Sequence, residues 1–227
     1  MTTPYYADES VTLYHGDCLE VTEWLAADVL VTDPPYGIGW QPSRNFGTGR
    51  SFAPEGIVGD ATTEARDSAL EAWGATRPAL VFGNRRFPML DAKAWLIFEK
   101  PTTASGLMGN RSPWLRNWEP IFVCGDWPRQ VPWRSAVVTT RWKAAAGYSG
   151  YVTTAGHSHA KPLDVMEALI DACPPGTVAD PFAGSGSTLV AAKRLGRKAI
   201  GCEIEERYCE MAAKRLRQGV LDFGGAA

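Results

Sequence analysis

Thr177-Val-Ala-Asp-Pro-Phe-Ala-Gly-Ser-Gly-Ser-Thr188 joins a short apolar strand to a helix through a glycine-rich turn, and it indicates the fold class of the chain. Gly184 and Gly186 allow the backbone to approach a ligand closely, and the start of the predicted helix offers free backbone N–H groups. A second apolar strand follows and ends at Glu203, whose carboxylate can accept hydrogen bonds from two ribose hydroxyls. This order of strand, turn, helix, strand and acid is typical of a site for an adenosine-containing cofactor.

The turn alone leaves the ligand open. A phosphate-binding loop needs a lysine before the Ser or Thr, and Gly186-Ser187-Thr188 lacks it. A dinucleotide-binding turn needs a third glycine, where this chain has Leu189. A glycine-containing turn without any ligand remains the alternative at this point.

Outward from this stretch, strand and helix patterns alternate along the chain. Strands are predicted over 11–15, 28–32, 79–82, 94–98, 120–124, 177–179 and 198–202, and helices over 19–27, 63–73, 162–173, 186–195 and 205–217. This alternation predicts an α/β fold with a doubly wound, mostly parallel sheet. Ligands of such sheets bind at the carboxyl ends of the strands, so the site is expected there.

Composition and length set further bounds. The 227 residues, 45% of them hydrophobic, suit one domain with one core. The chain has no apolar run of about 18 residues and no signal-peptide pattern, so we expect a cytoplasmic protein without a membrane span. Five scattered cysteines without a C-x-x-C pair predict free thiols and no metal site.

Charge is unevenly distributed along the chain. The net charge is −2, but residues 101–143 hold six Arg or Lys against two acids, with five tryptophans among them (Trp114, Trp118, Trp127, Trp133 and Trp142). Basic residues mixed with aromatics suit a surface that binds phosphates and stacks bases. A solvated basic face beside core tryptophans is the alternative, and the sequence favours neither.

Asp33-Pro34-Pro35-Tyr36 ends the buried strand predicted over 28–32. The two prolines exclude helix and central strand, so a backbone carbonyl is freed from strand pairing beside a carboxylate and an aromatic ring. Asp33 and the Pro34 carbonyl could accept the two hydrogens of a base amine, and Tyr36 could stack on an extruded base. A proline-rich turn without function is the alternative.

These motifs together resemble the DNA amino-methyltransferases, in the permuted (β-class) order where the catalytic motif precedes the cofactor loop. Gly16-Asp17-Cys18-Leu19 is similar to the family's acidic motif, and Asp33 to Tyr36 is the catalytic motif itself. His157-Ser-His-Ala-Lys161-Pro162 resembles the family's H-x-x-x-K-P element, and the stretch from Gly196 to Tyr208 is similar to its tail. The resemblance implies a circularly permuted, seven-stranded, Rossmann-like methyltransferase sheet that covers residues 1–227 as one catalytic domain.

The resemblance also implies the site residues and the cofactor, S-adenosylmethionine, without a metal. Catalysis falls to Asp33, Pro34, Pro35 and Tyr36. Cofactor binding falls to Asp17, Cys18, Asp33, Pro34, His157, Lys161, Pro162, Asp180, Phe182, Ala183, Gly184, Ser185, Gly186, Thr188 and Glu203. Lys161 is expected to face the cofactor carboxylate, and His157 to cap the following helix or line the cofactor pocket.

The expected reaction is methyl transfer to N6 of adenine in double-stranded DNA. Cytosine-N4 relatives commonly carry Ser where Asp33 stands, but a cytosine-N4 enzyme, an RNA enzyme and an inactive binding relative remain open. Only residues 126–156 are available for a target-recognition segment, aided by a loop at 39–59. Arg44, Arg50, Arg129, Arg134 and Arg141 are the expected DNA contacts. Recognition could also need a second subunit, so a homodimer is left open.

Overall fold

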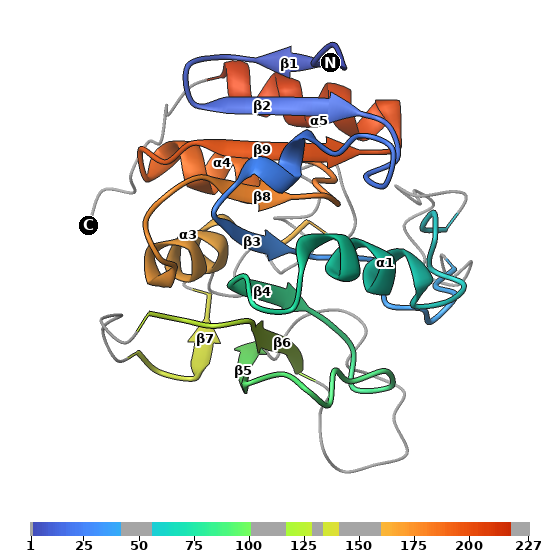
Figure 1. The fold of residues 1–227 in the computed structure, drawn as a ribbon, viewed down its shortest axis with the longest axis vertical. Coiled ribbons are helices and arrows are strands. Elements are labelled where there is room, and N and C mark those ends of the chain that lie inside the picture. The colour runs from blue at the N-terminus through green and yellow to red at the C-terminus, as the bar shows by residue number, and fades with distance from the viewer. Residues whose placement is uncertain (1, 42–55, 101–116, 129–133, 141–159, 219–227) are drawn as a thin grey trace, which may run out of the picture.

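The structure, a computed structural model, describes residues 2–41, 56–100, 117–128, 134–140 and 160–218. It is built on a nine-stranded sheet in the order β1-β2-β9-β8-β3-β4-β6-β5-β7 (Figure 1). The strands are β1 (Tyr6–Ala7), β2 (Val11–His15), β3 (Val29–Thr32), β4 (Ala79–Phe82), β5 (Ala94–Glu99), β6 (Trp118–Cys124), β7 (Val137–Thr139), β8 (Val178–Asp180) and β9 (Ala199–Glu203). The helices are η1 (Glu23–Ala26), α1 (Glu64–Trp73), α3 (Leu163–Ala172), α4 (Ser187–Arg194) and α5 (Glu206–Arg217).

Strand direction gathers the loops of the sheet at one edge. The run β2-β9-β8-β3-β4 is parallel throughout, and β6 runs antiparallel between β4 and β5. Because β7 is parallel to β5, every described strand except β1 and β6 ends at the same edge. We call this edge, where those strands end and β6 begins, the catalytic edge, because the residues predicted to be catalytic follow β3 there.

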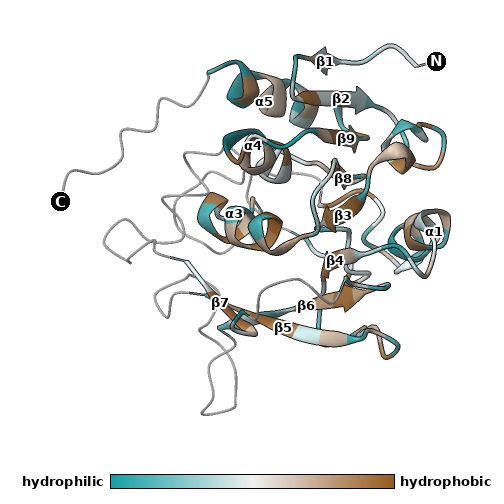
Figure 2. Cartoon of the chain, turned by 60° about the vertical axis from the view of Figure 1, so that its left-hand side comes forward, coloured by the Kyte–Doolittle hydropathy of each residue, from teal (hydrophilic) through white to brown (hydrophobic). Residues whose placement is uncertain are grey.

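Helices cover both faces of the sheet (Figures 1 and 2). In Figure 2, α3, α4 and α5 lie on one face and α1 lies on the other. Consecutive residues of β3 point to opposite faces: Val29 and Val31 pack in the cluster with the helices α3 to α5, and Leu30 packs in the cluster that contains Trp24 and Trp73. Burial on both faces explains why β3 reads as a continuous apolar run.

Chain connectivity places a topological switch point between β3 and β8. From β3 the chain passes through α1 to β4 on one side, and from β8 it passes through α4 to β9 on the other side. The two neighbouring strands therefore lead away from each other and leave a crevice at their carboxyl ends. Doubly wound sheets bind their ligands at such a point.

The predicted α/β class and mostly parallel sheet are confirmed, with two corrections. All seven predicted strands are present, but the two short edge strands β1 and β7 bring the sheet to nine. The helix predicted over 19–27 is a four-residue 3₁₀ turn, η1. The carbonyl of Cys18, which would serve an α-helix there, instead accepts a hydrogen bond of 2.8 Å from the Trp24 indole.

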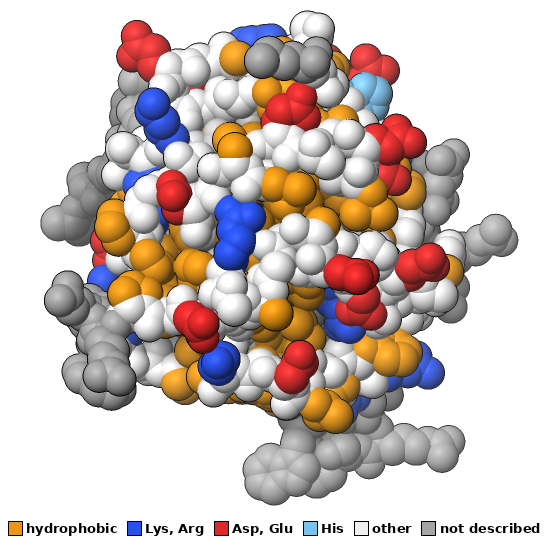
Figure 3. Space-filling view, viewed as in Figure 1, with side chains coloured by type: hydrophobic (Ala, Val, Ile, Leu, Met, Phe, Trp, Pro, Cys, Tyr) orange, Lys and Arg blue, Asp and Glu red, His pale blue; other side chains and the backbone are white. Residues whose placement is uncertain are grey.

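The surface is mixed in charge. Figure 3 shows acidic, basic and apolar side chains interspersed on the face that carries α1, without a dominant sign. All five cysteines are unpaired and lie buried or half-buried, as the sequence predicted. None of the described helices is both long and apolar enough for a bilayer crossing.

Candidate active site

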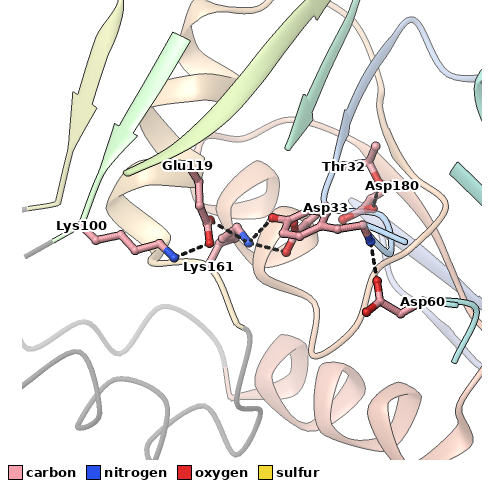
Figure 4. Close-up of polar contacts among 8 residues, drawn as sticks. Thr32, Asp33, Asp60, Lys100, Glu119, Lys161 and Asp180 are labelled. Carbon is pink, nitrogen blue, oxygen red and sulfur yellow. Dashed lines mark hydrogen bonds and ion pairs between the residues drawn. The ribbon is translucent and has the colours of Figure 1, made fainter. Parts of the chain in front are cut away.

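Asp33 lies directly after β3 and is held by two donors (Figure 4). Its Oδ2 accepts a hydrogen bond of 2.6 Å from Lys161 Nζ, and its Oδ1 accepts one of 2.6 Å from the Tyr36 hydroxyl. Lys161 Nζ also lies 3.1 Å from the Tyr36 oxygen. A carboxylate offers about four lone-pair positions, so Asp33 keeps acceptor capacity for a further donor.

Tyr36 and Pro34 complete the quartet. Burial, followed by the negative charge of Asp33, raises the pKa of Tyr36 well above its usual value, so its phenol stays protonated and remains a donor. No described group donates a hydrogen bond to the carbonyl of Pro34, and its role as an acceptor for a base amine stays a prediction. The quartet thus presents a carboxylate and a carbonyl beside an aromatic ring.

Asp60 fixes the chain that follows the quartet. It lies in the loop before α1, is only 2% exposed, and accepts three backbone hydrogen bonds. Its Oδ1 binds the N–H groups of Tyr36 and Gly37 at 2.7 and 2.9 Å, and its Oδ2 binds that of Trp40 at 2.7 Å. A buried carboxylate is normally retained only with such partners, so Asp60 determines the path of this loop.

A chain of alternating charges extends from Asp33 across the sheet (Figure 4). Lys161 Nζ lies 3.4 Å from Glu119 Oε2 at the start of β6, and Glu119 Oε1 pairs with Lys100 after β5. Burial acts to raise the pKa of Glu119, but the positive charges of Lys161 and Lys100 outweigh it and the pKa is lowered. Glu119 therefore stays ionised and holds both cations.

Asp180 connects the quartet to the glycine turn across the switch point. Its Oδ1 accepts hydrogen bonds from the Thr32 hydroxyl at 2.7 Å and from the Phe182 N–H at 3.1 Å. Burial raises the pKa of Asp180 to about 7. The residue before the quartet is thereby joined to the first residue of the turn, and the two motifs meet at one edge, as the sequence predicted.

Glu203 ends β9 and supports the turn from the other side. Its Oε2 accepts a hydrogen bond of 2.7 Å from the Gly184 N–H, and its Oε1 accepts one of 2.8 Å from the Glu205 N–H. Burial raises its pKa. Two carboxylate lone pairs remain for further donors, and Asp17 follows the neighbouring strand β2 at the same edge. These carboxylate acceptors fit the hydroxyl-bearing ribose of an adenosine cofactor.

The structure brings most of the predicted site residues together. The motifs Asp17-Cys18, Asp33 to Tyr36, Lys161-Pro162, Asp180 to Thr188 and Glu203 all lie at the catalytic edge. Lys161 contacts Asp33, Tyr36 and Glu119 within the quartet's surroundings, so its expected contact with a cofactor carboxylate stays a prediction. His157, Arg44, Arg50, Arg129 and Arg141 lie outside the described residues.

Arg134 is not brought to this edge. It precedes β7 at the opposite edge of the sheet, where its guanidinium pairs with Asp171 near the end of α3 at 2.7 Å. Trp127 packs against the core and donates to the Cys124 carbonyl at 2.9 Å. Trp118 is 39% exposed at the catalytic edge. Of the basic and aromatic segment, only Trp118 is thus described at the site.

Residues 93–214 match the model of the N6/N4 DNA methylase family. The chain belongs to this family. The predicted family, and with it the predicted cofactor S-adenosylmethionine, is thereby confirmed. This DNA methylase is 31% identical to the YubD protein of Escherichia coli K12, over 88% of each chain. It is 26% identical to the type II methyltransferase M.ScaI of Streptomyces caespitosus, over 94% of this chain and 83% of that one.

Solved structures share the fold of the DNA methylase. The complex of M1.HpyAVI with S-adenosylmethionine aligns over 91% of this chain and 98% of that one, with 20% identity and a TM-score of 0.61. The cytosine-N4-specific PvuII DNA methyltransferase aligns over 99% of this chain and 91% of that one, with 16% identity and a TM-score of 0.62. At these identities the likeness shows a common architecture.

Three residues at the site were not found from the sequence: Asp60, Lys100 and Glu119. Asp60 lies between a glycine and a polar loop, and no motif marks it. Lys100 and Glu119 lie at the ends of predicted strands, and only the antiparallel pairing of β5 with β6 places them together. Charged residues at the ends of neighbouring strands were the available signal.

Proposed function

We propose that this DNA methylase transfers a methyl group from S-adenosylmethionine to the exocyclic N6 amine of adenine in double-stranded DNA. The observation that carries the proposal is the arrangement of Asp33 at the switch point, where Lys161 and Tyr36 each hold its carboxylate at 2.6 Å. The neighbouring strand β8 leads directly into the cofactor-type turn.

Cofactor binding falls to the turn and to the acids around it. Glu203 and Asp17 would accept the ribose and adenosine donors, and the segment from Asp180 to Thr188 would lie against the rest of the cofactor. When bound, S-adenosylmethionine supplies an electrophilic methyl group on a sulfonium centre. Gly186 has a positive φ of 82°, and a Cβ there would lie 2.8 Å from that of Ala212, so α4 starts where only glycine fits.

The amine is activated by hydrogen bonding. A base amine is a weak nucleophile because its lone pair is delocalised into the ring. If Asp33 and the Pro34 carbonyl each accept one amine hydrogen, the nitrogen lone pair is freed from the ring and directed away from them. The nitrogen would bond to the methyl carbon as the bond from that carbon to the sulfonium sulfur breaks, which leaves a neutral thioether. The nitrogen would then lose a proton, for which Asp33 is the acceptor. Orientation and exclusion of water are the main contributions of the protein.

The choice of adenine rests on Asp33, the first residue of the quartet. Tyr36 can stack on either base, and both adenine and cytosine offer an amine with two hydrogens, so neither feature separates the two substrates. Asp at this position favours adenine, because cytosine-N4 members of the family commonly carry Ser there. Cytosine and RNA are therefore alternative outcomes of the test.

The proposal also covers the domain organisation of the chain and its contacts with DNA. Residues 1–227 act as one catalytic domain, with recognition supplied by the segment at 126–156 and the loop at 39–59. Arg44, Arg50, Arg129 and Arg141 keep their proposed role as DNA contacts. A homodimer is one assembly in which two such segments could read a longer site.

The test is methyl transfer followed by identification of the product. Purified protein is incubated with labelled S-adenosylmethionine and with duplex DNA, single-stranded DNA or RNA of matched sequence, and the digested nucleosides are identified by mass spectrometry. We expect N6-methyladenine from duplex DNA, lost in Asp33→Asn, which keeps the side-chain shape. N4-methylcytosine as the product would overturn the assignment of adenine, and label only in RNA would overturn that of DNA.

A further inference from the structure

A cleft of about 690 Å³ opens at the catalytic edge on the side away from the glycine turn. Its lining comes from the segment after the quartet, the loop after β4, the end of β5 and the start of β6. The lining residues that matter are Trp40, Arg85, Arg86, Lys100, Trp118 and Glu119. The volume lies in the range of about 300–1,000 Å³ that is usual for ligand sites.

The side chains of this cleft combine aromatic rings with positive charge. Trp118 is 39% exposed and Trp40 is half-buried, so both indoles have surface available inside the cleft. Arg85 is exposed and has neither a hydrogen-bond nor an ion-pair partner among the described residues. The guanidinium of Arg86 lies 5.9 Å from the Phe87 ring and pairs with no described acid. With Lys100 and Glu119 included, the lining carries a local charge of +2 in a chain of net charge −2.

One lining residue of the cleft, Glu119, is connected to Asp33 through ion pairs with Lys161. Glu119 lines the cleft, and its Oε2 lies 3.4 Å from Lys161 Nζ, which in turn lies 2.6 Å from Asp33 Oδ2 (Figure 4). Neither Asp33 nor Tyr36 is part of the lining. A molecule against Glu119 in the cleft would therefore be connected through Lys161 to Asp33, the carboxylate proposed to hold the reacting base.

These features match the chemistry of an unstacked nucleotide. Indole faces stack on any base, and arginines bind phosphate. Solvated arginines on a surface are common, but here they lie with two accessible indoles in one hollow at the catalytic edge. A purely solvated surface does not account for that combination.

We propose that this cleft binds the nucleotide of the target strand adjoining the flipped base, with its base against Trp118 and Trp40 and its phosphates at Arg85 and Arg86. The inference rests on the proposed function, because it takes the base at Asp33 to be the methylated one. It adds a second nucleotide position, on the β4-β6 side of the sheet.

The experiment measures binding of the full chain to a fluorescein-labelled 12-residue oligothymidylate as a function of salt. The variants are the double substitution Arg85→Ala with Arg86→Ala, and Trp118→Ala. Lys198→Ala is the matched control, since it removes one exposed cation at the start of β9, on the opposite edge. Binding of S-adenosylmethionine, measured in parallel, is expected to equal that of the unmodified chain in all three.

We expect the arginine variant to reduce the slope of log affinity against log salt by about 0.7 for each lost phosphate contact, while Lys198→Ala leaves it unchanged. Trp118→Ala should weaken binding about tenfold at every salt concentration without changing the slope. Slopes and affinities equal to those of the unmodified chain would overturn the proposal. Failure of adenine methylation, with these binding results intact, would overturn only the proposed function.

Discussion

Lys161 contacts two acids, Asp33 and Glu119, and its side chain is only 7% exposed. Its position within the H-x-x-x-K-P element suggested a role at the cofactor. Its contacts with Asp33, Tyr36 and Glu119 indicate that it also orients the Asp33 carboxylate, which is proposed to be catalytic. Removal of one partner from a buried ion pair leaves the other charge uncompensated, which costs about 3–5 kcal/mol.

Lys161→Met is therefore expected to lower kcat by about 100-fold, because a misplaced Asp33 no longer orients the amine. Lys161→Arg should recover part of the rate, since it keeps the charge. Folding lowers the pKa of Glu119 below its usual value of 4.5, so ionised Glu119 stabilises the fold above pH 4.5. This stabilisation is lost as the pH falls through the lowered pKa. The stability difference between Lys161→Met and the unmodified chain should thus shrink below about pH 4 in urea unfolding. An unchanged kcat in Lys161→Met would show that Asp33 is oriented without it.

Asp180 gives a pH dependence of the opposite sign. Its pKa is raised from 3.8 to about 7 by burial, so the folded state binds a proton that the unfolded chain releases. This contribution to stability is complete below pH 4 and is lost as the pH rises through about 7, up to about 4 kcal/mol in total.

Asp180→Asn keeps an acceptor for Thr32 and cannot ionise. Its free energy of unfolding, measured by urea titration from pH 4 to pH 8, should increase relative to that of the unmodified chain as the pH rises. Parallel curves for the two proteins would mean that Asp180 ionises in the fold as it does in the unfolded chain.

At the scale of elements, the start of α4 depends on one glycine. Gly186 and Gly196 both have positive φ values, 82° and 68°, which cost an alanine about 1–2 kcal/mol. A Cβ at Gly186 would also lie 2.8 Å from that of Ala212 on α5, whereas a Cβ at Gly196 would have no heavy atom within 4 Å.

Comparison of Gly186→Ala with Gly196→Ala therefore separates backbone strain from close packing. Both variants should lose about 1–2 kcal/mol of stability, and Gly186→Ala should lose at least 1 kcal/mol more. Only Gly186→Ala should also weaken S-adenosylmethionine binding, measured by calorimetry. Equal losses in stability and equal cofactor affinity for the two variants would show that the close contact between α4 and α5 does not require glycine at position 186.

Elements with long, regular patterns were predictable from the sequence, and short or tertiary features were not. Among the described elements, seven strands and four of the five helices follow from apolar periodicity and from Gly and Pro boundaries. The edge strands β1 and β7 have two and three residues, too few to show a period. Asp60 was missed because its three backbone partners lie 20 to 24 residues earlier, and nothing local to it indicates them.

At the scale of the whole molecule, the proposed catalytic and cofactor-binding parts share one sheet. The pairing of β3 with β8 and the hydrogen bond between Thr32 and Asp180 join them within a single core. Cofactor binding should therefore stabilise both parts together. At a hundredfold excess over Kd, S-adenosylmethionine adds about 2.7 kcal/mol.

Hydrogen exchange can test this coupling. We expect S-adenosylmethionine to slow amide exchange in β4, far from the glycine turn, by a factor similar to that in β9, because both open through global unfolding. The exposed segment before β1 serves as an internal control and should not change. Slower exchange in β9 with β4 unaffected would show that the two parts open independently.

The pairing of β3 with β8 also bears on how the chain is synthesised. Asp180 emerges from the ribosome 148 residues after its partner Thr32. At a translation rate of about 5–20 residues per second, β3 remains without its neighbour β8 for a time on the order of 10 seconds. During that interval the nascent chain exposes an apolar strand that is prone to aggregate. The yield of folded protein in the cell should therefore depend on chaperones that bind this strand until translation is nearly complete.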